Sequence, residues 1–185
     1  MTMCNKFSPM RAVMEISTRR PFRVLAIDPG YDRLGIAVIE GDPSRPTLLM
    51  SACVMPEKGA HEERLARVFS AVADAITEYA PAALALETLF FSINKKTALG
   101  VAEARGAILA AAGSASLPVI ECSPQQVKLA VTGHGGSRKA AVAAMIPRLL
   151  HLPKKKRLDD ELDAIAIGIT ALATGLLRDQ KDKKW

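Results

Sequence analysis

The feature that most constrains this chain is a short, almost uninterrupted apolar run near its beginning, FRVLAI at residues 22–27. A strand with one wet face alternates apolar and polar residues, whereas a run without alternation indicates a strand buried on both faces. Such a strand needs helices on both sides of its sheet. We therefore expect an α/β protein, in which Asp28-Pro29-Gly30 ends the first, central strand.

The order of the remaining elements narrows the fold. Apolar spacing and turn residues predict strands at 34–39, 47–55, 83–86 and 117–121, and helices at 61–79, 96–112, 124–131, 138–150 and 159–177. The first three strands are expected to form an antiparallel meander. Strands and helices then alternate, and helices close the chain. This order matches a ribonuclease H-like fold, a mixed five-stranded sheet flanked by helices.

Length and composition favour one domain without a membrane segment. The 185 residues fit a single core, expected over 23–178, with a flexible extension at 1–22 and a charged tail at 179–185. No apolar run reaches the roughly 20 residues that span a bilayer, and the first residues lack the apolar core of a signal peptide. Three widely separated cysteines give no disulfide framework, so we expect a cytoplasmic protein.

Four acidic residues occupy the ends of predicted elements. Asp28 ends the first strand, Glu87 ends the fourth, and Asp160 and Asp163 share one face at the start of the last helix. Chemistry in α/β sheets concentrates at strand ends. Two such charges about 4 Å apart repel by roughly 4 kcal/mol, so a cluster of four needs cations. Hard oxygen ligands favour Mg²⁺ or Mn²⁺, and two such ions suit phosphodiester cleavage.

Each acid also has an ordinary structural explanation. Asp28 before Pro-Gly is a common turn residue, and Glu87 suits a solvated strand end. Asp159, Asp160 and Glu161 are typical first-turn acids, favoured by the helix dipole. Asp163 lies deeper, beside the apolar run AIAI, where a purely structural role is harder to justify.

Basic and aromatic residues add candidates for binding nucleic acid, which also agrees with the net charge of +6. Lys128, Arg138, Lys139 and the run at 154–157 can neutralise phosphates, although the run can equally be a solvated surface. Phe90 and Phe91 follow Glu87, and an exposed aromatic there can stack on a base. The alternative is that both fill the core.

Four blocks in a fixed order carry a family resemblance. They are LAIDPG at 25–30 with Gly35, LETLF at 86–90 with Asn94 and ARG at 104–106, QVK at 126–128 with TG at 132–133 leading to Lys139, and DELDAIAI at 160–167. Together, from about residue 23 to 172, they resemble the RuvC family of bacterial Holliday junction resolvases. One block would be weak support, but the ordered set is specific.

The resemblance implies roles for the candidate residues. It assigns metal binding and catalysis to Asp28, Glu87, Asp160 and Asp163, phosphate and DNA contacts to Lys128 and Lys139, with Lys139 also catalytic, and a base contact near the branch point to Phe90. It implies a homodimer formed through the helix around 104–106, two Mg²⁺ per site with Mn²⁺ as a substitute, and work with the RuvA–RuvB branch-migration complex. The expected reaction is paired symmetric nicking of four-way junctions in recombination and repair, leaving 5′-phosphate and 3′-hydroxyl ends.

Three other classes of protein share parts of this pattern. A ribonuclease H-like nuclease of the YqgF type is typically shorter and lacks the ARG and QVK blocks. The sugar-kinase, Hsp70 and actin group needs two such domains around a nucleotide, more than 185 residues supply. A non-enzymatic junction-binding module would keep the basic residues and lose an acid, and none of the four is missing here.

Overall fold

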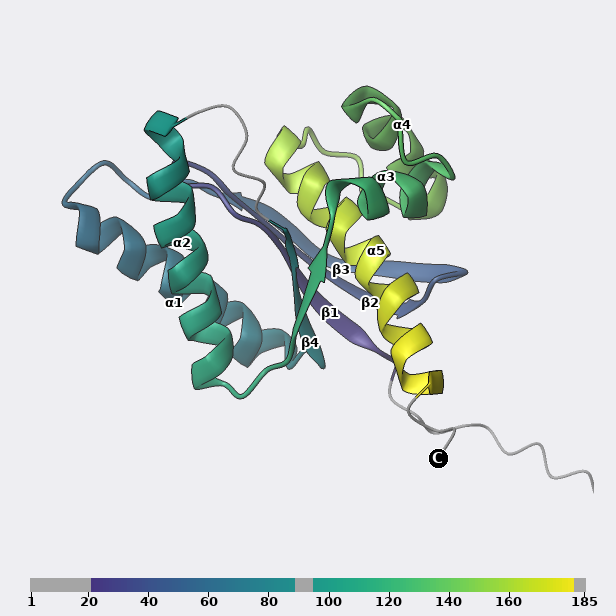
Figure 1. Ribbon diagram of the computed structural model, residues 1–185, viewed down its shortest axis with the longest axis horizontal. Helices are drawn as coiled ribbons and strands as arrows, with labels where there is room; N and C mark the ends of the chain where they lie inside the picture. The colour runs from purple at the N-terminus through teal and green to yellow at the C-terminus, as the bar shows by residue number, and fades with distance from the viewer. Residues whose placement is uncertain (1–20, 89–94, 182–185) are drawn as a thin grey trace, which may run out of the picture.

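The computed structural model describes residues 21–88 and 95–181. The described strands are β1 (Arg23–Asp28), β2 (Leu34–Asp42), β3 (Arg45–Val54), β4 (Ala83–Glu87) and β5 (Val119–Cys122), and the helices are α1 (His61–Tyr79), α2 (Lys95–Ser114), α3 (Pro124–Thr132), α4 (Lys139–Leu149) and α5 (Asp159–Lys181). The strands form one five-stranded sheet in the order β3-β2-β1-β4-β5 (Figure 1). The expected mixed sheet flanked by helices is confirmed.

Strand pairing brings the carboxyl ends of β1 and β4 to one edge. β1 lies between antiparallel β2 and parallel β4, and β5 extends the parallel half. Ile27 pairs with Leu86, so Asp28 and Glu87 follow the same rung on neighbouring strands. Across the antiparallel pair, Asp28 faces Gly35 of β2. The register thus converges on the end of β1.

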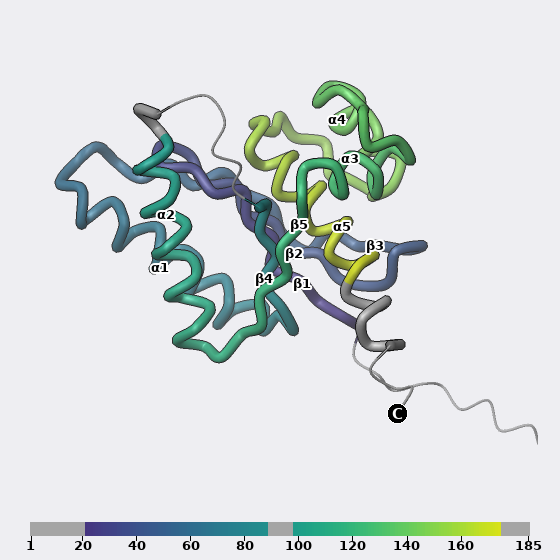
Figure 2. Tube along the Cα trace, in the orientation of Figure 1, coloured from purple at the N-terminus to yellow at the C-terminus, as the bar shows by residue number. Residues whose placement is uncertain are grey.

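Each face of the sheet has its own helical layer, as Figures 1 and 2 show. α1 and α2 cover one face, whereas α5 lies across the other with α3 and α4 packed beside it. Alternate residues of β1 enter the two cores: Leu25 and Ile27 pack toward α1 and α2, and Val24 and Ala26 toward α5. All four are fully buried, which explains why the run at the beginning of the chain does not alternate.

Two glycines allow α5 to lie directly on the sheet. A Cβ at Gly35 of β2 would lie 2.0 Å from the backbone oxygen of Asp160, so the first turn of α5 contacts the strand backbone. A Cβ at Gly168 would lie 2.7 Å from Cδ1 of Ile39 and 3.2 Å from Cβ of Ala26. Their missing side chains set the depth of α5, and therefore the height of its acids above β1.

Element boundaries follow local chemistry. α1 spans the predicted residues, whereas β5 begins two residues later than expected, after Pro118, which has no amide hydrogen to donate. A capping box begins α3: Ser123 Oγ accepts from the Gln126 amide at 3.2 Å, and Gln126 Oε1 accepts from the Ser123 amide at 2.8 Å. Within the described residues, no helix is both long and apolar enough to cross a membrane.

Filling the space at Gly168 tests how tightly α5 packs. Gly168→Ala should lower the free energy of unfolding by about 1–2 kcal/mol, because the new methyl group overpacks the contact with Ile39. In an Ile39→Val background, which removes the Cδ1 atom, the cost should shrink. Denaturant unfolding measures both. Gly113→Ala is the control, since a Cβ there meets nothing within 4 Å; an equal cost at Gly168 in both backgrounds would contradict the contact.

Candidate active site

Three elements bring the four predicted acids to one end of β1. Asp28 is the last residue of β1, Glu87 is the last of β4, and Asp160 and Asp163 lie in the first turns of α5. The charges of Glu87, Asp160 and Asp163 all act on Asp28. Residues up to 135 positions apart therefore share one site, as their positions at element ends predicted.

The cluster holds more negative charge than the protein compensates. The pKa of Asp28 is raised to about 7, first by burial and then by the charges of Asp163, Glu87 and Asp160. Burial is also the largest cause that raises the pKa of Glu87, followed by the charge of Asp163. Burial raises the pKa of Asp163 too, although Lys139 opposes the shift. Such a group of anions is favourable only with a cation nearby.

Two basic side chains supply part of that charge. Lys139, the first residue of α4, places Nζ 2.5 Å from Asp163 Oδ2. Arg33, in the turn between β1 and β2, places Nε 3.2 Å from Asp160 Oδ2. This Asp160 oxygen is buried and accepts no hydrogen bond from any described residue, so the guanidinium is close but not aligned to donate. No sequence pattern pointed to Arg33, apart from its nearness to Asp28.

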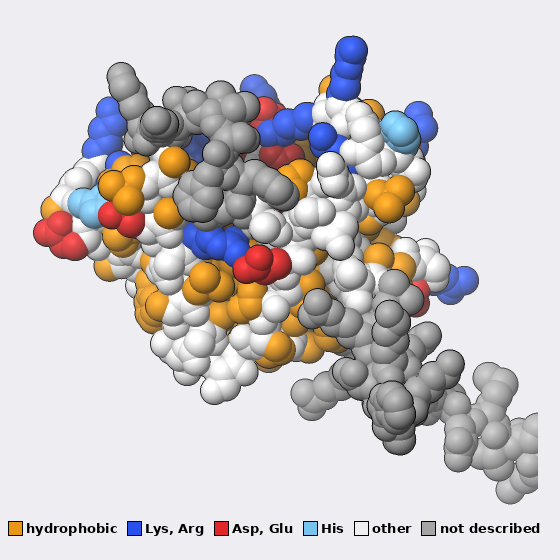
Figure 3. Space-filling model, in the orientation of Figure 1, with side chains coloured by type: hydrophobic (Ala, Val, Ile, Leu, Met, Phe, Trp, Pro, Cys, Tyr) orange, Lys and Arg blue, Asp and Glu red, His pale blue; other side chains and the backbone are white. Residues whose placement is uncertain are grey.

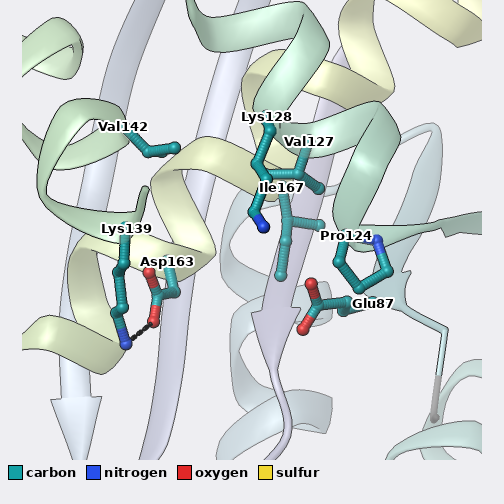
Figure 4. A pocket seen from close by; sticks show the side chains of 8 residues that line it. All are labelled: Glu87, Pro124, Val127, Lys128, Lys139, Val142, Asp163 and Ile167. Atoms are coloured by element: carbon teal, nitrogen blue, oxygen red, sulfur yellow. Dashed lines mark ion pairs between the residues drawn. The ribbon is translucent and has the colours of Figure 1, made fainter. Parts of the chain in front are cut away.

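The basic residues meet the acids in a hollow of about 200 Å³. Its polar wall consists of Glu87, Lys128, Lys139 and Asp163, and its apolar wall of Pro124, Val127, Val142 and Ile167 (Figure 4). Lys128 comes from α3 and points into the same hollow as Glu87 and the Lys139–Asp163 pair. In Figure 3, one group of acidic side chains near the top of the view is recessed, with Lys and Arg side chains beside it, whereas other acidic side chains lie on the surface. The arrangement suits a phosphate held between metal ligands and lysines.

The donor set fits a hard divalent cation. Four carboxylates, one with a buried and unsatisfied oxygen, are the ligands that Mg²⁺ or Mn²⁺ prefers. Burial, followed by the charges of neighbouring acids, raises the pKa values of Asp28 and Glu87, and a nearby cation would oppose these shifts. As the described side chains lie, no group of three or more His, Cys, Asp or Glu residues is arranged to hold a metal ion. Lys139 and Arg33 instead hold Asp163 and Asp160.

A buried arginine positions the end of β4. Arg105 of α2 is 9% exposed, and its guanidinium donates to the backbone oxygen of Glu87 at 2.8 Å and to Glu121 Oε1 at 2.6 Å. These bonds connect α2, β4 and β5 directly behind the Glu87 carboxylate. The sequence pointed to Arg105 only as part of the ARG block. Its signal was a charged residue within a helix of mostly small and apolar residues.

The basic run before α5 is partly internal. Glu161 lies in the first turn of α5, as expected, but it is 4% exposed and accepts from Ser51 Oγ at 2.6 Å. Lys155 Nζ lies 2.7 Å and Arg157 Nε 3.3 Å from its carboxylate. These two cations therefore fasten the segment before α5 to β3. Within the run at 154–157 only the Arg157 side chain is largely buried, and Lys155 stays 45% exposed despite its ion pair. Lys154 and Lys156 are exposed and remain candidate phosphate contacts.

Two further predicted binding residues have different outcomes. Arg138 is exposed and occupies the N-cap position of α4, where its side chain makes no capping hydrogen bond. It directly precedes Lys139, which lines the hollow. Phe90, together with Phe91, lies outside the described residues, and its proposed base contact stays a prediction.

Comparisons with known proteins identify the family of this chain. The family model described as crossover junction endodeoxyribonuclease RuvC matches residues 24–171. The RuvC of Desulforamulus reducens is 40% identical over 147 residues, covering 79% of this chain and 90% of its own. The RuvC of Moorella thermoacetica is 39% identical over 147 residues, covering 79% of this chain and 88% of its own. The structure of T. thermophilus RuvC in complex with Holliday junction substrate superimposes with a TM-score of 0.80 at 33% identity, covering 85% of this chain and 96% of that one.

The crowding of acids makes a prediction about stability and pH. Between the ordinary pKa of 3.8 and the folded value of about 7, folded Asp28 keeps a proton that the unfolded chain has released. The free energy of unfolding therefore falls as pH rises through this range. Asp28→Asn should stabilise the metal-free protein by about 2 kcal/mol at pH 8, with the gain vanishing below about pH 4.

Denaturant unfolding with a chelator, at pH 4 and pH 8, measures this gain. The control is Asp74→Asn, which removes an exposed acid of α1 and should leave the pH dependence unchanged. A gain for Asp28→Asn that is equal at both pH values would rule out titration of Asp28 as its cause.

Proposed function

Because this chain belongs to the RuvC family of crossover junction endodeoxyribonucleases, we propose that it resolves Holliday junctions by paired, symmetric, metal-dependent nicks. Each nick would leave a 5′-phosphate and a 3′-hydroxyl, in recombination and DNA repair. The observation that carries this proposal is the meeting of four carboxylates from β1, β4 and α5, with Lys128 and Lys139 beside them.

We propose Asp28, Glu87, Asp160 and Asp163 as the residues that hold two Mg²⁺ ions, for which Mn²⁺ can substitute. When bound, such ions supply a nucleophilic water at neutral pH and stabilise the leaving 3′-oxygen. The buried unsatisfied oxygen of Asp160 and the raised pKa of Asp28 support this assignment. Both observations support a divalent cation at this site, because it carries more charge than one lysine.

The basic residues would bind and orient the scissile phosphate. Lys139 restrains Asp163 through its 2.5 Å ion pair, and its 64% exposed side chain can also reach a phosphate oxygen. Lys128 enters the same hollow from α3. The walls formed by Val127, Val142 and Ile167 limit water around these charges, which strengthens their attraction for the phosphate. Arg138 and Phe90 extend the proposed DNA contacts.

A homodimer would match the symmetry of the reaction, because two-fold protein symmetry places two sites for two symmetric nicks. α2 offers the surface for it. Leu99 is 68% exposed and Leu109 is 38% exposed, and both lie on the same face as Gly106 and Gly113, where a Cβ would meet nothing within 4 Å. Small residues permit close helix contact, so this face supports the dimer helix implied by the ARG block. We further propose action with the RuvA–RuvB complex.

A synthetic four-way junction, compared with a linear duplex of equal length, tests the function. With Mg²⁺ we expect paired symmetric nicks in the junction and none in the duplex, and a chelator should abolish cutting. Intact junctions despite tight, metal-independent binding would indicate a binding module. Cutting of RNA or plain duplex would indicate another ribonuclease H-like nuclease.

Asp163→Asn separates chemistry from binding. The change keeps the shape of the side chain and leaves Lys128 and Lys139 in place, but it removes a proposed metal ligand. Cutting should therefore fall by at least about 10²-fold. Junction affinity in a chelator should stay within about threefold of wild type, or improve, because one negative charge is lost. Asp74→Asn on α1 is the charge-matched control. Loss of binding together with cutting would contradict this division.

A further inference from the structure

A second hollow lies on the Asp160 side of the carboxylates. It measures about 760 Å³ and is bounded by the β1–β2 turn, the beginning of α1 and the first half of α2. Asp160 and Arg33 line it, whereas Glu87 and Asp163 line the first hollow with Lys128 and Lys139. The carboxylate cluster thus separates two depressions. A DNA strand that crosses the cluster would leave one depression and enter the other.

The turn that presents Arg33 is held from both sides. Tyr31 Oη hydrogen-bonds with His61 Nδ1 at 2.7 Å, and Arg64 lies over the Tyr31 ring, 3.9 Å from its centroid. Arg64 also donates to the Tyr31 backbone oxygen at 3.0 Å and to Asp32 Oδ1 at 2.7 Å. On the α2 side, Gly100 leaves room for the Tyr31 ring, because a Cβ at this position would lie only 3.0 Å from the ring. The backbone under Arg33 is therefore fixed by α1 and α2.

The side chain of Arg33 is less restrained than its backbone. It is 48% exposed, and its Nε lies 3.2 Å from Asp160 Oδ2 without forming a hydrogen bond. The pair is partly exposed and lacks a hydrogen bond, so the guanidinium can leave it once the Asp160 charge is neutralised. A guanidinium also matches a phosphate better than it matches a single carboxylate oxygen, because its fork can donate to two oxygens.

We infer that Arg33 is a phosphate-binding residue that exchanges Asp160 for the DNA backbone. While the Asp160 charge is uncompensated, Arg33 stays paired with it. Once a bound cation or a substitution neutralises the Asp160 charge, the guanidinium turns to the phosphate of the strand that lies in the second hollow. Lys139 and Arg33 would then contact the strand on opposite sides of the reacting phosphate. This inference rests on the proposed junction-cutting function and adds a DNA contact on the Asp160 side of the carboxylates.

Junction binding in a chelator, measured across a range of salt concentrations, tests the exchange with four proteins: wild type, Arg33→Gln, Asp160→Asn and the double variant. In the wild-type background, Arg33→Gln should change the dissociation constant by less than about twofold, since Arg33 is occupied by Asp160. In the Asp160→Asn background it should weaken binding about fivefold and lower the salt slope by about 1. Arg33→Lys should restore part of the loss.

Matched controls exclude general effects of charge and folding. Arg67→Gln removes an arginine of α1 that pairs with exposed Glu57, 2.8 Å away, and should act equally in both backgrounds. Melting temperatures establish that each variant folds. If Arg33→Gln has the same small effect in both backgrounds, Arg33 is only a partner of Asp160. If it weakens binding equally in both, there is no exchange. Either result overturns the inference.

A DNA-free measurement gives a second test that does not depend on Asp160→Asn folding. Calorimetric titration with Mn²⁺ should show severalfold tighter binding to Arg33→Gln than to wild type, because a competing cation at Asp160 has been removed; unchanged affinity contradicts the exchange. The junction-cutting function is judged separately. Cutting of the junction by wild type and its loss in Asp163→Asn do not require Arg33 to contact DNA.

Discussion

The close approach of α5 to β2 is the constraint on which the site depends. The backbones of β2 and α5 are in direct contact where Gly35 faces Asp160. Further along α5, Gly168 packs closely against Ile39 and Ala26 of the sheet. Any side chain at Gly35 would lift the first turns of α5, and with them two of the four carboxylates. The strand register supplies the other two, since Asp28 and Glu87 follow the paired residues Ile27 and Leu86. The site is thus an outcome of main-chain packing as much as of its acids.

That packing holds together groups that repel one another. Burial and mutual charge raise the pKa values of Asp28, Glu87 and Asp163, so the folded chain carries a cost in free energy that its two hydrophobic cores offset. Lys139 and Arg33 reduce the cost without removing it. A site of this kind is ready for cations and phosphate, and it is one place where function opposes stability.

Local patterns predicted much of this arrangement. Helical spacing gave α1 its bounds, and the position of each acid at the end of an element led to the cluster. The residues that pair with those acids could not be predicted from local patterns. Arg33 pairs with Asp160 across 127 positions, and Glu161 joins Ser51 across 110, so neither pairing has a local signature. Arg105 was visible only as an unusual charge in a small-residue helix.

The residues of the site also differ in how firmly the two cores hold them. Asp28 ends a strand enclosed by both cores, and opening it would disrupt the packing on each face of the sheet. Lys139, in contrast, belongs to α4, which packs on α3 and α5. Regions with few buried contacts open locally at lower free energy than the centre of a domain. We therefore expect the Asp28 carboxylate to be held more rigidly than the Lys139 side chain, which leaves the proposed DNA contact more freedom than the proposed metal ligand.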